Sequence, residues 1–231
     1  MDLEDIPLRL KKGEPIAFLD EYAVISDLHI GFEKELLNDG YVIWDKTQET
    51  LDKILHIEKR KLIILGDIRG SFTQILPLEG GMIFRVINSL SAKFEEVIIT
   101  KGNHDGGLSK ITSRLGNVQL VDEFIYKDIG FMHGHAMPSK KLVSESTTVC
   151  LGHMHPAVTL KDSNSVYYKQ DCWLLMDVRM PKGLYPQGKL KYAVVFPKFN
   201  PYIGSSDDIK KKGIMKYSKT VKRITTDLLV V

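Results

Sequence analysis

Lys101-Gly102-Asn103-His104-Asp105 directly follows the apolar run Val97-Ile98-Ile99-Thr100. The run is β-branched and too short for a buried helix, so it predicts a strand of a covered sheet that ends in a turn at Gly102. An amide, an imidazole and a carboxylate then stand at the carboxyl end of a strand, where open α/β sheets bind their ligands. The stretch therefore predicts a chemical site as well as a fold.

Four further apolar strands end in the same kinds of residue. In chain order, the strand ends are Ser26-Asp27-Leu28-His29 after Ala23-Val24-Ile25, Gly66-Asp67 after 62–65, His133-Gly134-His135 after 129–132, and Gly152-His153-Met154-His155 after 149–151. Six of the seven histidines lie in these motifs. The seventh, His56, lies in a helical pattern and is expected to be a core or surface residue. Such clustering indicates that the strand ends meet at one site.

These motifs contain oxygen and imidazole donors, namely Asp27, His29, Asp67, Asn103, His133, His153 and His155. The set is too large for one tetrahedral ion and suits two divalent ions that share a ligand. Donors without thiolate favour manganese, with iron, zinc or nickel as alternatives, over calcium or copper(I). Two such ions lower the pKa of a bridging water and bind the attacking and leaving oxygens of an in-line displacement at phosphorus. The donor set therefore predicts phosphate-ester hydrolysis.

Two residues beside the ligands are the expected catalytic pair. By strand alternation, His104 points away from its neighbour Asn103. It can then protonate the leaving oxygen or stabilise the charge of the phosphorane. Asp105 either orients His104 or shapes the turn.

The remaining pattern predicts the element order. Helices are expected at 31–38, from Asp45 to about Arg60, and at 82–92, 108–115 and 140–146, with a glycine-marked loop through Gly80-Gly81. Further strands are expected at 16–19, 118–132 (two or three), 147–151, 157–160, 172–178 and 190–196. Because only the first half alternates strands with helices, we predict an α/β fold (α+β by some schemes) with two mixed sheets packed face to face and helices outside.

Composition limits the class of protein and its location. The chain has 231 residues, of which 43% are hydrophobic and 26% charged, and no linker demands a domain break, so we expect one domain over residues 1–231. The acidic start of the sequence does not resemble a secretory signal, and no apolar stretch is long enough to span a bilayer. Cys150 and Cys172 lie in apolar runs and are expected to be reduced core residues. We therefore expect a cytoplasmic protein without membrane contact.

A basic segment occupies the C-terminal part, from about residue 205 to 231. Residues 210–223 carry seven positive charges and no negative charge, against a net charge of +3 for the whole chain. Such a segment is either a contact for a phosphate polymer or a solvated face, and both interpretations stay open.

The ordered motifs Asp-x-His, Gly-Asp, Gly-Asn-His-Asp, a lone His and Gly-His-x-His resemble the calcineurin-like metallophosphoesterase superfamily. The resemblance implies a four-layer αββα sandwich with two packed mixed β-sheets. It also implies that Asp27, His29, Asp67 and His155 hold one ion, and that Asp67, Asn103, His133 and His153 hold the other. His104 matches the catalytic histidine of the family. We assign the ligand role to His133 instead of His135 because His133 lies directly at the strand end.

A narrower similarity links residues 26–33 and 195–200 to small archaeal phosphoesterases related to the Mre11/SbcD nucleases and to DNA-ligase-associated phosphoesterases. Those nucleases carry Gly-Asp-x-x-His, whereas Gly66-Asp67-Ile68-Arg69-Gly70 ends in glycine. We expect a phosphodiesterase that acts on nucleotides or nucleic acid through a metal-bridging hydroxide, with Arg69 and the basic segment as substrate contacts. A phosphomonoesterase, including a phosphoprotein phosphatase, and a non-catalytic metal-binding scaffold are the alternatives.

Overall fold

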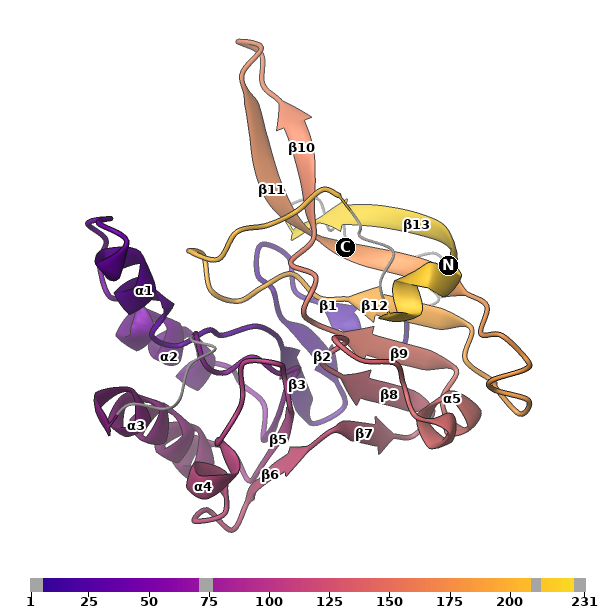
Figure 1. The fold of residues 1–231 in the computed structure, drawn as a ribbon, viewed down its shortest axis with the longest axis horizontal. Coiled ribbons are helices and arrows are strands. Elements are labelled where there is room, and N and C mark those ends of the chain that lie inside the picture. The colour runs from indigo at the N-terminus through magenta and orange to yellow at the C-terminus, as the bar shows by residue number, and fades with distance from the viewer. Residues whose placement is uncertain (1–5, 71–76, 209–212, 227–231) are drawn as a thin grey trace.

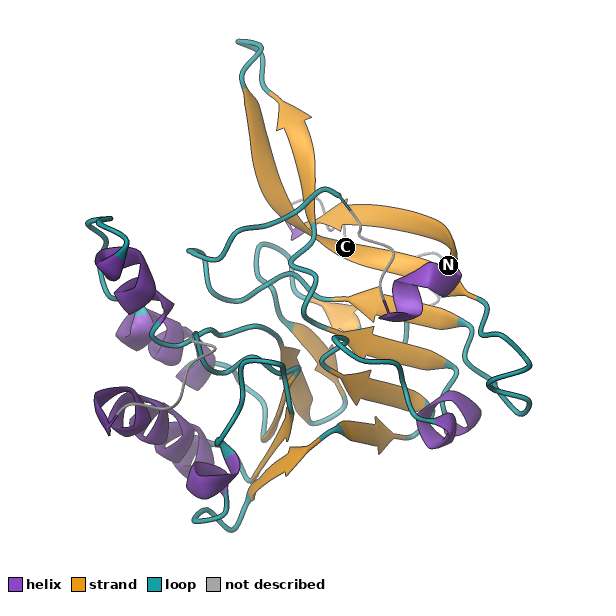
Figure 2. Ribbon diagram, in the orientation of Figure 1, coloured by secondary structure: helices purple, strands orange, loops and turns teal. Residues whose placement is uncertain are grey.

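The computed structural model describes residues 6–70, 77–208 and 213–226. Two β-sheets pack face to face, and helices cover their outer faces (Figures 1 and 2). This arrangement is the predicted four-layer α/β sandwich.

The first sheet has the strand order β1-β2-β3-β4-β5-β6. Its strands are β1 (Arg9–Leu10), β2 (Ala17–Leu19), β3 (Tyr22–Ile25), β4 (Lys61–Ile64), β5 (Glu96–Thr100) and β6 (Val118–Val121). The expected hairpin is present, since β2 pairs antiparallel with β3. From β3 to β6 all pairs are parallel, so the carboxyl ends of these four strands lie along one edge.

The outer face of this sheet is covered by α1 (Phe32–Asn38), α2 (Thr47–Leu55), α3 (Pro77–Lys93) and α4 (Ser109–Thr112) (Figure 1). Ile54 of α2 and Ile83 and Leu90 of α3 are buried in one cluster with alternate residues of the strands, such as Ile25 and Ile64. Across residues 6–70, 77–208 and 213–226, no helix is long and apolar enough to cross a membrane.

Three helix predictions are wrong in extent, and one of them is the helix expected at 108–115, which spans only Ser109–Thr112. The second helix ends at Leu55 instead of near Arg60, because the chain must turn back from its C-cap, His56, to enter β4. The third helix includes the glycine pair at 80 and 81 that was expected in a loop. Each helical glycine costs about 1 kcal/mol, which burial of the following Met82 and Ile83 offsets.

The second sheet has the order β10-β11-β12-β9-β8-β7, and β13 pairs with β11. Its strands are β7 (Glu123–Tyr126), β8 (Ile129–Met132), β9 (Thr148–Leu151), β10 (Ala157–Lys161), β11 (Tyr167–Val178), β12 (Tyr192–Val195) and β13 (Ser218–Thr225). The pairs β8–β9 and β9–β12 are parallel. The helix α5 (Lys140–Glu145) and the 3-10 helix η2 (Gly213–Tyr217) bury Leu142, Ile214 and Met215 against the outer face.

The layer between the sheets is apolar. Val24, Ile63 and Ile98 of the first sheet are buried in one cluster with Cys150 and Trp173 of the second. Cys150 and Cys172 are free and buried, as predicted. This core holds the two sheets together, and with them the two sets of strand ends.

Two features of the second sheet were not predicted. β11 starts at Tyr167, earlier than expected, and forms with β10 a hairpin that projects from the body (Figure 1). Part of the basic segment is also structured, because β13 pairs with β11 from Cys172↔Thr225 to Val178↔Ser218. Residues 210–212 of that segment lie outside the described residues.

Candidate metal centre

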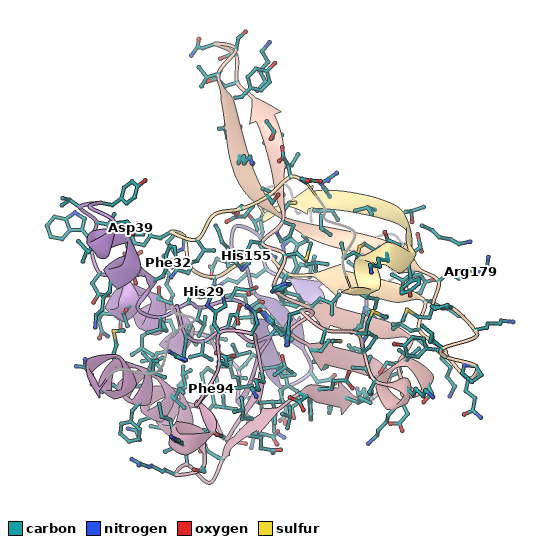
Figure 3. All side chains as sticks on the ribbon, viewed as in Figure 1. His29, Phe32, Asp39, Phe94, His155 and Arg179 are labelled. Carbon is teal, nitrogen blue, oxygen red and sulfur yellow. The ribbon has the colours of Figure 1, made fainter. Side chains whose placement is uncertain are left out.

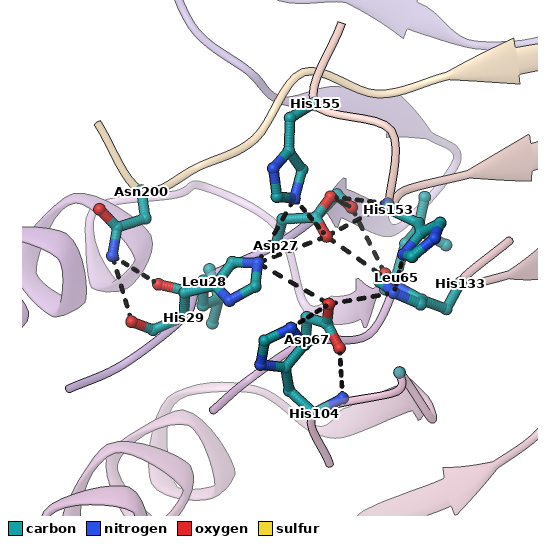
Figure 4. A network of polar contacts seen from close by, with 12 residues as sticks. Asp27, Leu28, His29, Leu65, Asp67, His104, His133, His153, His155 and Asn200 are labelled. Carbon is teal, nitrogen blue, oxygen red and sulfur yellow. Dashed lines mark hydrogen bonds and ion pairs between the residues drawn. The ribbon is translucent and has the colours of Figure 1, made fainter. Parts of the chain in front are cut away.

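The predicted strand ends come together where the two sheets face each other (Figure 4). β3, β4 and β5 are parallel neighbours and deliver Asp27, Asp67 and the Asn103 turn to one edge. β8 and β9 are also parallel neighbours and deliver His133 and His153 from the opposite sheet. The site therefore depends on the packing of both sheets.

The backbone at this site is unusual. Five of its residues have a positive φ: Asp27 (56°), His29 (42°), Asp67 (48°), His153 (69°) and His155 (41°). A side chain in this left-handed region costs about 1–3 kcal/mol, so the surrounding structure must hold it there. Backbone hydrogen bonds between two of the loops do so, since His29 N donates to Asp67 O at 2.9 Å and Asp27 N donates to Gly66 O at 3.3 Å.

Two glycines allow close approach at the site. Gly66 has a φ of +75°, and a Cβ there would overlap the His133 ring. A Cβ at Gly102 would overlap the Asp67 carboxylate. The glycines of the Gly-Asp and Gly-Asn-His-Asp motifs are therefore required by packing between neighbouring donors.

The first group of donor atoms comprises Asp27, His29 and His155. Nε2 of His155 lies 3.2 Å from Oδ1 of Asp27 and 3.4 Å from Nε2 of His29. Nε2 of His29 lies 3.9 Å from the same Asp27 oxygen and 3.8 Å from Oδ2 of Asp67. The donor atoms of Asp27, His29 and His155 all lie within 4.8 Å of one another, close enough for all three to bind one cation.

The second group surrounds Nε2 of His133. This atom lies 3.1 Å from Oδ2 of Asp67, 3.1 Å from Oδ1 of Asn103 and 3.2 Å from Nδ1 of His153. Asp67 links the two groups, because the same Oδ2 also lies 3.8 Å from Nε2 of His29 in the first group. His133 lies within this group, whereas His135 is exposed and belongs to neither group.

Burial and charge set the protonation states. Burial opposes ionisation of Asp27, but a histidine hydrogen bond and the surrounding imidazoles outweigh it and hold the Asp27 pKa below its usual range. Burial also disfavours a charged His133, yet its contact with Asp67 outweighs burial and raises the His133 pKa to about 9. Burial lowers the pKa of His29 and of His153 to about 4. Asp27 is thus ionised and His29 and His153 are neutral at pH 7, the states that ligate cations.

The residues present fit a pair of divalent ions. Asp27 and Asp67 are buried, and among the described residues neither pairs with lysine or arginine. Charged His133 compensates one of these two buried carboxylates, and bound cations would take the place of its proton and supply the remaining positive charge. The donors are oxygen and imidazole nitrogen without thiolate, a set that suits manganese, iron or zinc.

His104 lies beside the donors, with Nε2 3.8 Å from Oδ2 of Asp67. Among the described residues, the Asp105 carboxylate forms no hydrogen bond with the His104 ring. Asp105 instead shapes the turn that contains residues 102–105. Its carboxylate accepts hydrogen bonds from the backbone N–H of Ile68 at 2.9 Å and of Gly102 at 2.8 Å. Burial raises the pKa of Asp105 to about 6.

The prediction that Arg69 contacts the substrate is wrong, because its side chain is buried. It is only 1% exposed, and its guanidinium donates to the carbonyl oxygens of His104 at 3.1 Å and Gly106 at 2.8 Å. These bonds turn the side chain into the loop, so Arg69 braces the segment that carries His104.

Gly70 explains the departure from the nuclease pattern. A Cβ at this position would overlap the backbone of Phe32, and Gly70 N donates to Ile30 O at 2.9 Å. The backbone at residue 70 therefore leaves no room for a histidine or any other side chain at this position.

Asn200 is a residue whose role the motif analysis missed. It is 2% exposed, and its Nδ2 donates to Leu28 O at 3.1 Å and to His29 O at 3.2 Å (Figure 4). Its backbone N–H donates to Asp27 O at 3.3 Å. Asn200 thus fixes the left-handed loop that carries two donors. The similarity of residues 195–200 to known phosphoesterases was the available signal.

The centre opens into a pocket of about 350 Å³. Its lining includes Gly134, His135, His153, Met154, His155, Gly204, Ser206 and Asp208. Two of the donor histidines form part of this wall, so a substrate in the pocket would contact the centre directly.

A two-sheet sandwich with oxygen and imidazole donors at its strand ends is the architecture of a metal-dependent phosphoester hydrolase. The family model described as calcineurin-like phosphoesterase matches residues 21–192. Since the match spans most of the chain, the protein belongs to this family of phosphoester hydrolases, which typically bind divalent metals.

One solved structure shows the same fold over nearly the whole chain. The chain is similar to the nuclease MPE of Pseudomonas putida, with 17% identity and a TM-score of 0.60 over 95% of this chain and 96% of that chain. It is also similar to Yfce, a phosphoesterase from E. coli, with 18% identity and a TM-score of 0.39 over 63% of this chain and 75% of that chain. No curated protein matches the chain significantly.

Proposed function

We propose that this protein is a phosphodiesterase that uses two divalent metal ions, with nucleotides or nucleic acid as substrate. The observation that supports this proposal most strongly is the position of Asp67, whose Oδ2 lies 3.1 Å from His133 in one donor group and 3.8 Å from His29 in the other, with His104 beside it and outside the seven proposed ligands.

Asp27, His29, Asp67 and His155 would hold one ion, and Asp67, Asn103, His133 and His153 the other. When bound, two such ions supply an activated water and stabilise charge on the phosphoryl oxygens. Manganese is the proposed metal, because the set contains three oxygen donors and no thiolate.

The protein's own residues supply the rest of the chemistry. His104 would donate a proton to the leaving oxygen. Its backbone N–H donates to Oδ1 of Asp67 at 2.9 Å, which fixes the carboxylate. Asp105 and Arg69 hold the turn from both sides and keep His104 in position.

Two observations support a diester over a monoester. Phosphatases commonly hold a phosphate dianion with arginine, whereas no arginine lines the described pocket at the centre and Arg69 is buried. The fold shared with the Pseudomonas putida nuclease supports nucleic acid as the substrate class.

The test compares two chromogenic substrates after the protein has been stripped of metal and reloaded with manganese. We expect hydrolysis of bis-p-nitrophenyl phosphate to exceed that of p-nitrophenyl phosphate, and Asp67→Asn to abolish both. Faster hydrolysis of the monoester would make the protein a phosphomonoesterase. Two bound metals without either activity would make it a metal-binding scaffold.

A further inference from the structure

A second polar pocket, of about 720 Å³, lies where β11 ends and β12 begins. Its wall carries four cationic side chains, Arg179, Lys182, Lys191 and Lys219, and one carboxylate, Asp177. Arg179 directly follows β11, Lys191 directly precedes β12, and Lys219 lies on β13. All four cations are exposed. We name this site the basic pocket.

The basic pocket is separate from the metal centre. β12 runs parallel to β9, with Tyr192 opposite Thr148, so Lys191 lies near the amino end of β9. His153 and His155 follow the carboxyl end of the same strand. A strand of four residues spans about 13 Å, so the backbone of β9 separates the two sites by about that length. Figure 3 shows Arg179 at the end of the molecule away from His29 and His155.

The charges of the basic pocket are unbalanced. Within the part of the chain that the structure describes, none of its four cations forms an ion pair, and Asp177 accepts a hydrogen bond from Thr220. Other described pockets contain paired charges, such as Lys53 with Glu49 and Arg60 with Glu21. Unpaired cations in one concavity attract an anionic ligand.

Protection of an exposed strand edge explains only part of this pattern. Lysines on an edge strand prevent it from pairing with another chain, which accounts for Lys219 on β13. Arg179, Lys182 and Lys191 lie in the connection between two paired strands, so that explanation does not apply to them.

We propose that the basic pocket binds the phosphate backbone of a polynucleotide whose scissile diester lies at the metal centre. The guanidinium of Arg179 can hold phosphate oxygens in a fork, while the lysines act as point charges. The proposal rests on the proposed function and adds a contact about one strand length from the chemistry. It makes the substrate a polymer, because a mononucleotide cannot reach both sites.

The test measures binding without catalysis. The variant K182E/K191E and a matched control, K12E/K93E, carry the same change of charge, and Lys12 and Lys93 are exposed residues outside both sites. Binding of a labelled single strand of about 20 nucleotides, longer than most sites for single strands, is followed by fluorescence anisotropy in EDTA over a range of salt concentrations.

We expect K182E/K191E to bind at least ~10-fold more weakly than the control and to lose about 1.4 from the salt slope, ~0.7 for each phosphate contact. With manganese, KM for the oligonucleotide should rise while hydrolysis of bis-p-nitrophenyl phosphate stays unchanged. Equal binding by the two double variants overturns the proposal. Stronger competition by inorganic tripolyphosphate than by an equal phosphate concentration of DNA also overturns it, since the ligand is then a small polyphosphate.

The two proposals fail in different ways. Absence of hydrolysis of the small diester contradicts the proposed function and leaves the binding difference measurable. A binding difference that is absent while the small diester is still hydrolysed contradicts the basic pocket alone.

Discussion

The two ends of the second sheet carry their polar groups in opposite ways. At the carboxyl ends of β8 and β9, His133 is buried and His153 and His155 are partly buried, and each belongs to a group of donors whose atoms lie within 4.8 Å of one another. At the amino ends of β9 and β12, four cations stand exposed, and none pairs with a carboxylate in the described residues. Ligand binding at the first end depends on the exact positions of the donor atoms. Ligand binding at the second end depends on the total positive charge.

This difference has an energetic origin. Burial makes every misplaced donor costly, so the metal centre needs left-handed residues, close glycines and hydrogen bonds such as those of Asn200. Exposed lysines keep their hydration and rotamer freedom, so they adapt to a ligand without a supporting frame. Substitutions should therefore have large and specific effects at one end and small, additive effects at the other.

The largest expected effect is that of Asp67→Ala, which removes the carboxylate that we propose bridges the two ions. Both metals should be lost or weakened, and diester hydrolysis should fall by ~10³-fold or more, since each ion stabilises the transition state by several kcal/mol. Metal analysis after dialysis checks this. Two tightly retained ions in this variant would show that Asp67 is not the bridge.

His104→Ala tests whether chemistry and metal binding are separate within the centre. We expect kcat to fall by ~10²–10⁴-fold with unchanged metal content, because His104 acts on the proton and not on the metal. Since His104 also forms a cluster with His29 and Asp67, the loss of one ion would instead make it a ligand.

Asn200→Ala tests whether the hydrogen bonds that hold the loop of Asp27 and His29 contribute to metal binding. The variant should weaken metal affinity or activity by ~10–100-fold. Asn117→Ala is the matched control, because Asn117 Nδ2 also donates to two backbone carbonyls, of Ser91 and Phe94, far from the centre. Both variants should lose about 1–3 kcal/mol of stability. If metal titration gives the same affinity for both, Asn200 serves the fold alone.

The smallest effect is expected for Lys182→Gln and Lys191→Gln. Each should change the free energy of unfolding by less than ~0.5 kcal/mol, because neither side chain has an ion partner in the described residues. Urea titration measures this. A decrease of more than 1 kcal/mol in the free energy of unfolding, about the net contribution of one hydrogen bond, would mean that these lysines stabilise the fold.

Much of the first sheet and of the centre follows from the sequence, because the signals are local. β-branched runs at 22–25, 62–65 and 97–100 predict parallel strands, and the next residues must then meet at one edge. All seven proposed ligands lie together in the structure. A strand end fixes both the direction and the neighbours of the side chains that follow it.

The unpredicted parts depend on contacts between distant residues. β13 forms because Ile224 packs against the core opposite Trp173, although its own sequence is rich in lysine. Arg69 lies next to a ligand motif, yet its guanidinium donates hydrogen bonds to carbonyl oxygens in the turn at 104–106. Asn200 contacts Leu28 and His29 across most of the chain. No local pattern predicts which distant partner a polar side chain will find.

β13 is translated well after β11, the strand with which it pairs, and this order has a consequence during protein synthesis. β11 is buried on both faces from Cys172 to Met176, and its edge pairs with a strand that begins only at Ser218. Until that strand has emerged from the ribosome, the nascent chain presents an unpaired apolar edge, the kind of surface that promotes aggregation. Chains interrupted before residue 218 should therefore depend on chaperones, even though every proposed metal ligand has already been made.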